Sequence, residues 1–133
     1  MAQADATGLV NRRSAQGVAE TVTALKHEIE HRGASVIAVI DHAAAARAAG
    51  LAMPATQVIV FGNPAAGTPL MQAVPDLAID LPLRLLVRDD GSPGSVVSWQ
   101  DPAYVADRFG LHGETGPLAA PHAIADATLD GTA

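Results

Sequence analysis

Hydrophobic residues recur at helical spacing near the start of the chain and then in short unbroken runs. Four apolar residues lie at i, i+4, i+7 and i+11: Val18, Val22, Leu25 and Ile29. This spacing places them on one stripe of an amphipathic helix, and Gly33 is suited to cap its C-terminus. The run SVIAVI at residues 35–40 is apolar and largely β-branched, so we expect a buried strand there.

A second helix and a second strand follow this run. Asp41 has the residue type and the position of an N-cap for the Ala-rich segment HAAAARAAG that comes after it. The segment TQVIVFG at residues 56–62 predicts another apolar strand. GNPAAGTPL at residues 62–70 consists of turn residues and leads into a short helical turn from Thr68 to Ala73.

The remaining pattern predicts a hairpin and one more helix. Residues 84–88 and 95–100 are expected to form two strands, because a turn rich in Asp, Gly, Ser and Pro separates them. Asp101 is expected to cap a last helix, which has Pro102 at its first position and which Gly110 ends. Residues 8–15 alternate weakly and predict an edge strand.

The expected order of elements is β-α-β-α-β-(short α)-β-β-α. Such a mixture favours an α+β fold, a single-domain sandwich in which helices pack on a mixed or antiparallel β-sheet. We expect a flexible N-terminus at residues 1–7 and one domain at residues 8–112. Residues 113–133 are rich in Ala, Gly and Pro, so we expect a loosely ordered C-terminal tail.

Composition narrows the classes of function. The chain is 49% hydrophobic but only 3% aromatic, so its core must consist mainly of aliphatic side chains. The net charge of −6 disfavours contact with phosphate backbones, so we expect no nucleic-acid partner. The absence of cysteine excludes disulfides and thiolate chemistry. Because neither a transmembrane run nor a signal-peptide pattern is visible, we expect a soluble cytoplasmic protein with no membrane partner.

The letters HEIEH at residues 27–31 match H-E-x-x-H, the pattern by which helices of many zinc peptidases bind their metal. On a helical wheel with Val22 at zero and about 100° per residue, His27 and His31 fall at about 140° and 180°. This is nearly opposite the apolar stripe, on the solvated face, where a zinc ion would lack a cleft and a third ligand. We therefore expect no cofactor and no functional metal site, with His27 and His31 as an adventitious surface pair.

Two other groups of residues are candidates for chemistry. Asp41 and His42 follow a strand, where open α/β sheets expose their sites, and could form an acid/base pair. The alternative is that Asp41 only caps the next helix. The segment GNPAAGTPLM could hold an anion on free backbone amides, or it is a tight turn whose glycines permit positive φ.

Several motifs resemble one family of small bacterial domains, DUF302. They are IDHAAAA from Ile40, FGNPAAGTPLMQ from Phe61, DLPL from Asp80 and DPAY from Asp101. Together with the preceding helix, the resemblance covers residues 8–112. It implies an α+β domain that associates as a homodimer. It transfers no catalytic residue, because the family has no established activity.

We therefore expect a non-enzymatic homodimeric module that binds a small molecule or a partner. The candidate surface combines polar turn residues and a histidine with apolar neighbours; its members are His42, Asn63, Thr68, Met71 and Gln72. Three alternatives stay open. The segment around Thr68 could only pack against the sheet or a second subunit. The chain could be an enzyme that uses His42 with Asp41, or a metal-binding protein that uses His27 with His31.

Overall fold

One antiparallel sheet organises the protein. The computed structural model describes residues 4–111 and 115–129. The five strands of the sheet lie in the order β1-β5-β4-β3-β2. In chain order they are β1 (Leu9–Ser14), β2 (Ser35–Asp41), β3 (Thr56–Gly62), β4 (Leu83–Arg88) and β5 (Ser95–Gln100). The architecture is α+β, as the sequence predicts.

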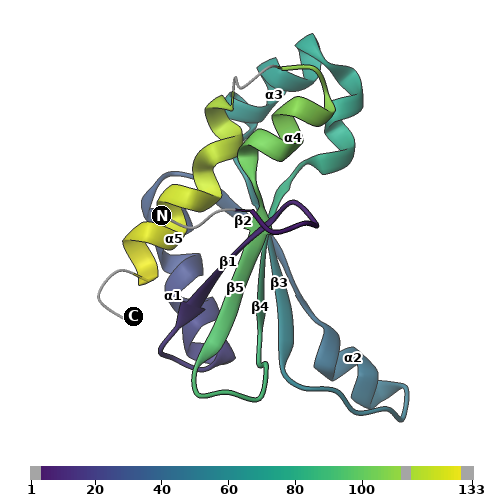
Figure 1. Cartoon of the computed structure of the whole chain (residues 1–133), viewed down its shortest axis with the longest axis vertical. Coiled ribbons are helices and arrows are strands. Elements are labelled where there is room, and N and C mark those ends of the chain that lie inside the picture. Colours follow the sequence, from purple (N-terminus) through teal and green to yellow (C-terminus); the bar gives the residue numbers. More distant parts are fainter. Residues whose placement is uncertain (1–3, 112–114, 130–133) are drawn as a thin grey trace.

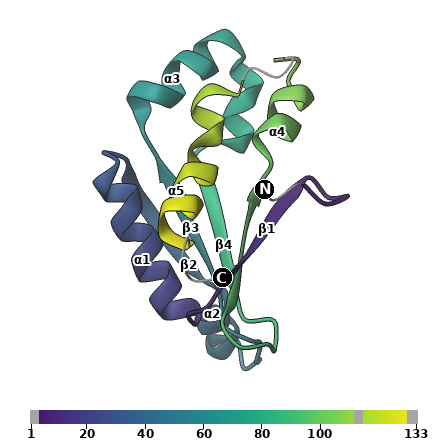
Figure 2. The same cartoon turned by 60° about the vertical axis from the view of Figure 1, so that its left-hand side comes forward.

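The helices cover one face of this sheet and gather at its two ends. They are α1 (Val18–His31), α2 (His42–Ala48), α3 (Pro64–Ala73), α4 (Pro102–Arg108) and α5 (Ala120–Leu129), with 3₁₀ turns η1 (Pro75–Asp80) and η2 (Gly116–Ala119). α1 and α5 lie on the same face, while α2 projects from one end and α3 and α4 lie at the other (Figures 1 and 2). No helix within the described residues is long and apolar enough to cross a membrane.

The main core lies between the sheet and the two covering helices. The whole predicted stripe of α1 is buried: Val18, Val22, Leu25 and Ile29. It packs against alternate residues of the central strands, among them Ile59, Phe61, Leu85, Val87, Val97 and Trp99. One face of the helix and one face of the strands thus form a single apolar layer. Aliphatic side chains make up most of this core, with Phe61 and Trp99 as its aromatic members.

A second, smaller core lies among the elements at one end of the sheet. Its buried members are Leu77, Val105, Ala106 and Leu118, and Leu83 packs against both this cluster and the main core. The carboxylate of Asp80 is buried nearby. It accepts hydrogen bonds from Arg108 Nη1 at 3.1 Å and from Gln100 Nε2 at 3.4 Å. These bonds join η1 to α4 and β5.

The N-caps of α2 and α4 are the residues that the sequence predicts, whereas α3 starts earlier than predicted. Asp41 Oδ1 accepts a hydrogen bond from the Ala44 amide at 2.9 Å, and Asp101 Oδ1 accepts one from the Ala103 amide at 3.3 Å. α3 begins before the predicted Thr68, at Pro64. Asn63 Oδ1 caps it by accepting from the Ala65 amide at 3.1 Å, so residues expected to form only a turn start the helix.

β2 forms where it was predicted, but the expectation that it is buried is wrong. The strand lies at an edge of the sheet, and Ile37, Val39 and Ile40 are 59%, 36% and 44% exposed. A continuous apolar run predicts a strand with neighbours on all sides. Its place at the edge depends on the pairing of distant strands, which the local pattern does not contain.

The expected loose tail also needs correction for the part that the structure describes. α5 lies within residues 113–133, and its Ile124, Ala125 and Leu129 are buried in the main core. Trp99 Nε1 donates a hydrogen bond to His122 Nδ1 at 3.0 Å, and the two rings meet edge to face. Residues 115–129 are therefore part of the domain. Residues 112–114 and 130–133 lie outside the described residues.

Candidate functional site

A hollow of about 540 Å³ opens between α3, α5 and the β2–β3 side of the sheet. Its floor is apolar and includes Phe61, Leu70, Leu83, Leu118 and Ile124. Phe61 and Ile124 belong to the main core, whereas Leu118 belongs to the small core. The hollow thus lies at the seam of the two cores, where neither cluster fills the space. We call it the seam hollow.

Polar groups are few and come from separate elements. The polar residues that line the seam hollow are Arg32, Ser35, Asn63 and Thr68. Arg32 follows α1, and two bonds position its guanidinium: Nε donates to Glu28 Oε2 at 2.8 Å and Nη2 donates to the Ala123 carbonyl at 3.4 Å. The lining includes no carboxylate, so its only formal charge is positive.

The structure brings part of the predicted surface together. Asn63, Thr68 and Met71 all line the seam hollow, where α3 presents them. Gln72 lies on the same helix but is exposed and outside the lining. Asn63 and Thr68 are themselves largely exposed, so they belong to the rim and not to the floor.

His42 does not join this group. It is the first residue of α2, which projects from the opposite end of the sheet (Figure 1), and its side chain is exposed. Asp41 beside it caps α2, as the structural alternative expected. An acid/base role required a His42 that lines a cavity, so this geometry gives the enzyme alternative no support.

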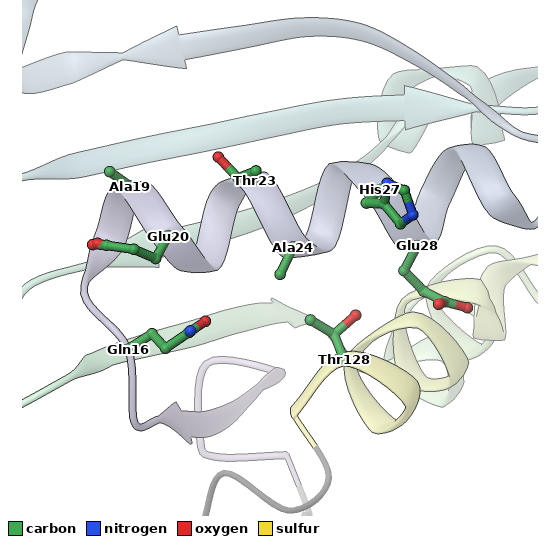
Figure 3. Close-up of a pocket in the computed structure, with 8 residues that line it drawn as sticks. All are labelled: Gln16, Ala19, Glu20, Thr23, Ala24, His27, Glu28 and Thr128. Carbon is green, nitrogen blue, oxygen red and sulfur yellow. The ribbon is translucent and has the colours of Figure 1, made fainter.

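A second hollow, a shallow groove of about 620 Å³, runs between α1 and the end of α5. Figure 3 shows His27 and Glu28 on α1 and Thr128 facing them from α5. His27 and His31 are exposed, as the helical wheel predicts. Among the described residues, no group of three or more His, Cys, Asp or Glu is placed to hold a metal ion.

The groove is less suited to hold a ligand than the seam hollow. Much of its lining is exposed, including Gln16, Glu20 and Thr23. The Thr128 hydroxyl is buried without a hydrogen-bond partner in the described part of the chain, and it is the one unusual polar group there. Ligand sites are commonly concave and mostly apolar with a few polar groups, so we take the seam hollow as the candidate site.

The carboxyl groups whose pKa values are clearly shifted lie outside the seam hollow. Hydrogen bonds from the Thr7 and Asn11 side chains and from nearby amides lower the pKa of Asp5 to about 2. The Ser92 amide and Arg13 lower the pKa of Asp90. Both carboxyl groups lie in surface turns outside the seam hollow, so the shifts reflect local turn structure.

Sequence reasoning missed most of the seam hollow. The sequence prediction of the site did not include Arg32, Phe61, Leu118 or Ile124. Apolar floor residues carry the same pattern as core residues, so no local signal separates them. Arg32 had one available signal, since it is a cation just before the uncharged run from Ser35 to Ile40.

Comparison with known proteins agrees with the fold. A family model described as "Domain of unknown function DUF302" matches residues 10–126. The crystal structure of an uncharacterized conserved protein DUF302 from Bacillus stearothermophilus superposes with a TM-score of 0.80 over 96% of this chain and 100% of that chain. At 16% identity, this likeness speaks for the fold alone.

Two relatives are similar to this chain in sequence. A fluoride-specific ion channel, FluC 1, from Brucella suis biovar 1 (strain 1330) is 41% identical over 105 residues, which is 79% of this chain. FluC 2 from Brucella melitensis biotype 1 shows the same identity over the same length. The chain spans 41% and 39% of the length of these two relatives, so the similarity concerns a minor part of each.

Proposed function

The chain belongs to the DUF302 family, a family of domains of unknown function, and from its geometry we propose that it is a non-enzymatic module that binds a small apolar molecule in the seam hollow. The observation that carries this proposal is the apolar floor of the hollow with one cation at its rim. We further propose that the module acts as a homodimer. The cytoplasmic location expected from the sequence stays a prediction.

Size and lining favour a mainly hydrocarbon or aromatic ligand. Small-molecule sites typically enclose about 300–1,000 Å³, and the seam hollow falls within this range at about 540 Å³. Burial of apolar ligand surface against the more exposed lining residues Ile37, Leu70 and Met71 would supply most of the binding free energy, at about 25 cal/mol per Å². The residues beneath them, Phe61, Leu118 and Ile124, are already packed in the two cores and need no ordering on binding.

The rim favours a ligand with a neutral or anionic end. Arg32 contributes the only charge of the lining, and Glu28 together with the Ala123 carbonyl holds it in place. Neither of these bonds uses Nη1, which leaves a charge-assisted donor for a carboxylate or sulfonate. The Ser35 and Thr68 hydroxyls also belong to the lining and can donate hydrogen bonds to a ligand. A cationic ligand would find no counter-charge in the lining.

The test measures binding of 8-anilinonaphthalene-1-sulfonate, an aromatic anion whose emission rises in apolar surroundings. Ala66 and Ala73 lie on the same helix, but Ala66 lines the seam hollow and Ala73 is exposed outside it. We expect Ala66→Phe to fill the hollow and weaken binding by about tenfold, or 1.4 kcal/mol. Ala73→Phe should leave binding unchanged.

Two outcomes would contradict the proposal. One is no saturable binding by the wild-type protein in its folded state. The other is equal binding by the Ala66→Phe and Ala73→Phe proteins, which would place the probe elsewhere. Arg32→Met tests the rim separately. It should weaken binding of the sulfonate and leave binding of an uncharged aromatic analogue unaffected.

A second candidate function comes from the Brucella relatives, whose names describe fluoride-specific ion channels. Since this chain matches about two fifths of their length, we propose as the second candidate that it associates with a channel of this kind. The test is co-expression of the tagged chain with the part of the Brucella suis protein outside the 105 matched residues. Co-purification in detergent supports the association, and separate elution contradicts it.

A further inference from the structure

The groove between α1 and α5 has the opposite electrostatic character to the seam hollow. Its lining includes the carboxylates of Glu20 and Glu28 and neither a lysine nor an arginine. The lining of the seam hollow includes Arg32 and no carboxylate. The two hollows share no lining residue. The groove therefore favours a cation, and such a ligand would not compete with an apolar or anionic ligand of the seam hollow.

The two carboxylates of the groove lie in one row along α1. Glu20, Ala24 and Glu28 follow one another at intervals of four residues, which brings them to the same side of the helix (Figure 3). The backbone positions of Glu20 and Glu28 are eight residues apart, which corresponds to about 12 Å along a helix axis. The small side chain of Ala24 leaves the middle of the row low, so a hydrocarbon chain can cross it.

Both carboxylates can still accept hydrogen bonds. Glu20 has no ion-pair partner within residues 4–111 and 115–129. Glu28 Oε2 accepts a hydrogen bond from Arg32 Nε at 2.8 Å, whereas its Oε1 has no donor in the same part of the chain. An ammonium group can therefore form a charge-assisted hydrogen bond at each end of the row.

The Thr128 hydroxyl adds a third polar group near the middle of the row. Thr128 belongs to α5, and its side chain faces Ala24 across the groove (Figure 3). Its Oγ1 atom is buried and has no hydrogen-bond partner in the part of the chain that the structure describes. An unpaired buried hydroxyl is unfavourable, and rotation about χ1 to another staggered rotamer can turn it towards a donor in the groove.

We propose that this groove binds an extended polyamine, a flexible hydrocarbon chain with a protonated nitrogen at each end and one between them. The terminal ammonium groups bind Glu20 and Glu28, the methylene groups cross Ala24, and the middle nitrogen donates to the Thr128 hydroxyl. Because ion pairs exposed to water are individually weak, binding depends on the whole row. The proposal does not rest on the ligand proposed for the seam hollow.

The experiment titrates the full chain with spermidine at low ionic strength and measures binding by isothermal titration calorimetry. We expect saturable binding that Glu20→Gln and Glu28→Gln each weaken by about fivefold, because each removes one charge-assisted contact. Glu30→Gln is the matched control, since Glu30 lies on α1 but is exposed outside the groove. It should bind spermidine as the wild type does.

Two outcomes of this titration overturn the proposal. One is the absence of saturable binding by the wild-type protein. The other is equal weakening by all three glutamine variants, which would mean that the net negative charge of the chain attracts spermidine to no particular place.

The contact with Thr128 is tested with a second amine, 1,8-diaminooctane, which has a similar length but no middle nitrogen. Thr128→Val replaces the hydroxyl by a methyl group of similar shape, so the melting temperature should not fall. We expect it to weaken spermidine binding by about threefold and to leave diaminooctane binding unchanged. Equal effects on the two amines would overturn the three-point arrangement.

Arg32→Met distinguishes the groove from the seam hollow. Arg32 lines the seam hollow and is bonded to Glu28 of the groove. Its removal frees the Glu28 carboxylate, so spermidine should bind about twofold more tightly while 8-anilinonaphthalene-1-sulfonate binds more weakly. Weaker binding of spermidine by this variant would contradict the assigned role of Glu28.

Discussion

At the scale of single residues, Gly94 has the most constrained backbone position in the hairpin. Its φ is +82°, a conformation that side chains other than glycine rarely adopt, and a Cβ there would lie 2.1 Å from the Ser14 carbonyl oxygen. This contact lies beside a buried hydroxyl cluster in which Thr21 Oγ1 bonds to Ser14 Oγ at 2.8 Å and to Ser95 Oγ at 3.2 Å. Glycine is thus required where the hairpin passes the end of β1.

The expected effect of Gly94→Ala follows from this geometry. We predict a loss of at least about 2 kcal/mol in the free energy of unfolding, because backbone strain combines with a clash against main-chain atoms that cannot rotate away. Gly91→Ala is the matched control. Gly91 has φ of +86° but nothing within 4 Å of the added Cβ, so only strain remains. Urea denaturation measures both, and equal losses would refute the role of the clash.

At the scale of elements, α5 shows how far packing can depart from composition. The segment is rich in Ala and Pro, which predicted loose structure, yet its larger apolar residues are buried. Ile124 and Leu129 reach the main core, and His122 accepts the Trp99 indole hydrogen bond. Without α5, part of the sheet face that α1 leaves uncovered would be exposed to water (Figure 2).

The role of α5 can be measured with one truncation. Ile124→Ala should lower the free energy of unfolding by about 2–5 kcal/mol, the usual range for deleting a buried aliphatic side chain. Ile79→Ala makes the same chemical change at a site that is 75% exposed, and we expect less than about 0.5 kcal/mol there. Both values come from urea titrations followed by Trp99 emission. Similar small losses would mean that residues 115–129 contribute little to the core.

β2 shows the opposite departure at the same scale. Its sequence has the character of a buried central strand, and the chain leaves it at an edge.

At the scale of the whole molecule, the seam hollow results from how the two cores are built. The sheet packs against α1 and α5 to enclose the main core. The elements η1, α4 and η2 form a separate cluster beyond the end of the strands. Leu83 contacts both clusters, and the Gln100 side chain of β5 donates a hydrogen bond to Asp80 of η1, which joins the smaller cluster to the sheet. The seam hollow lies between these two clusters, with Phe61 and Ile124 on one side and Leu118 on the other.

The sequence by itself determined features that depend on near neighbours. Asp41 and Asp101 cap their helices, the stripe of α1 is buried, and His27 and His31 are exposed, because a few residues of local backbone geometry fix each of these outcomes. The turn between β4 and β5 was predictable for the same reason.

Only the tertiary structure decided which apolar segments are buried and which side chains converge. β2 was expected to be buried but is exposed, and α5 lies in a segment that was expected to be loosely ordered but packs in the main core. His42 lies apart from Asn63 and Thr68, whereas Arg32 lies at the rim of the seam hollow. Each of these outcomes depends on contacts between elements distant in the chain. Hydrophobic burial is not directional, so a local pattern states that a residue prefers to be covered but not which partner covers it.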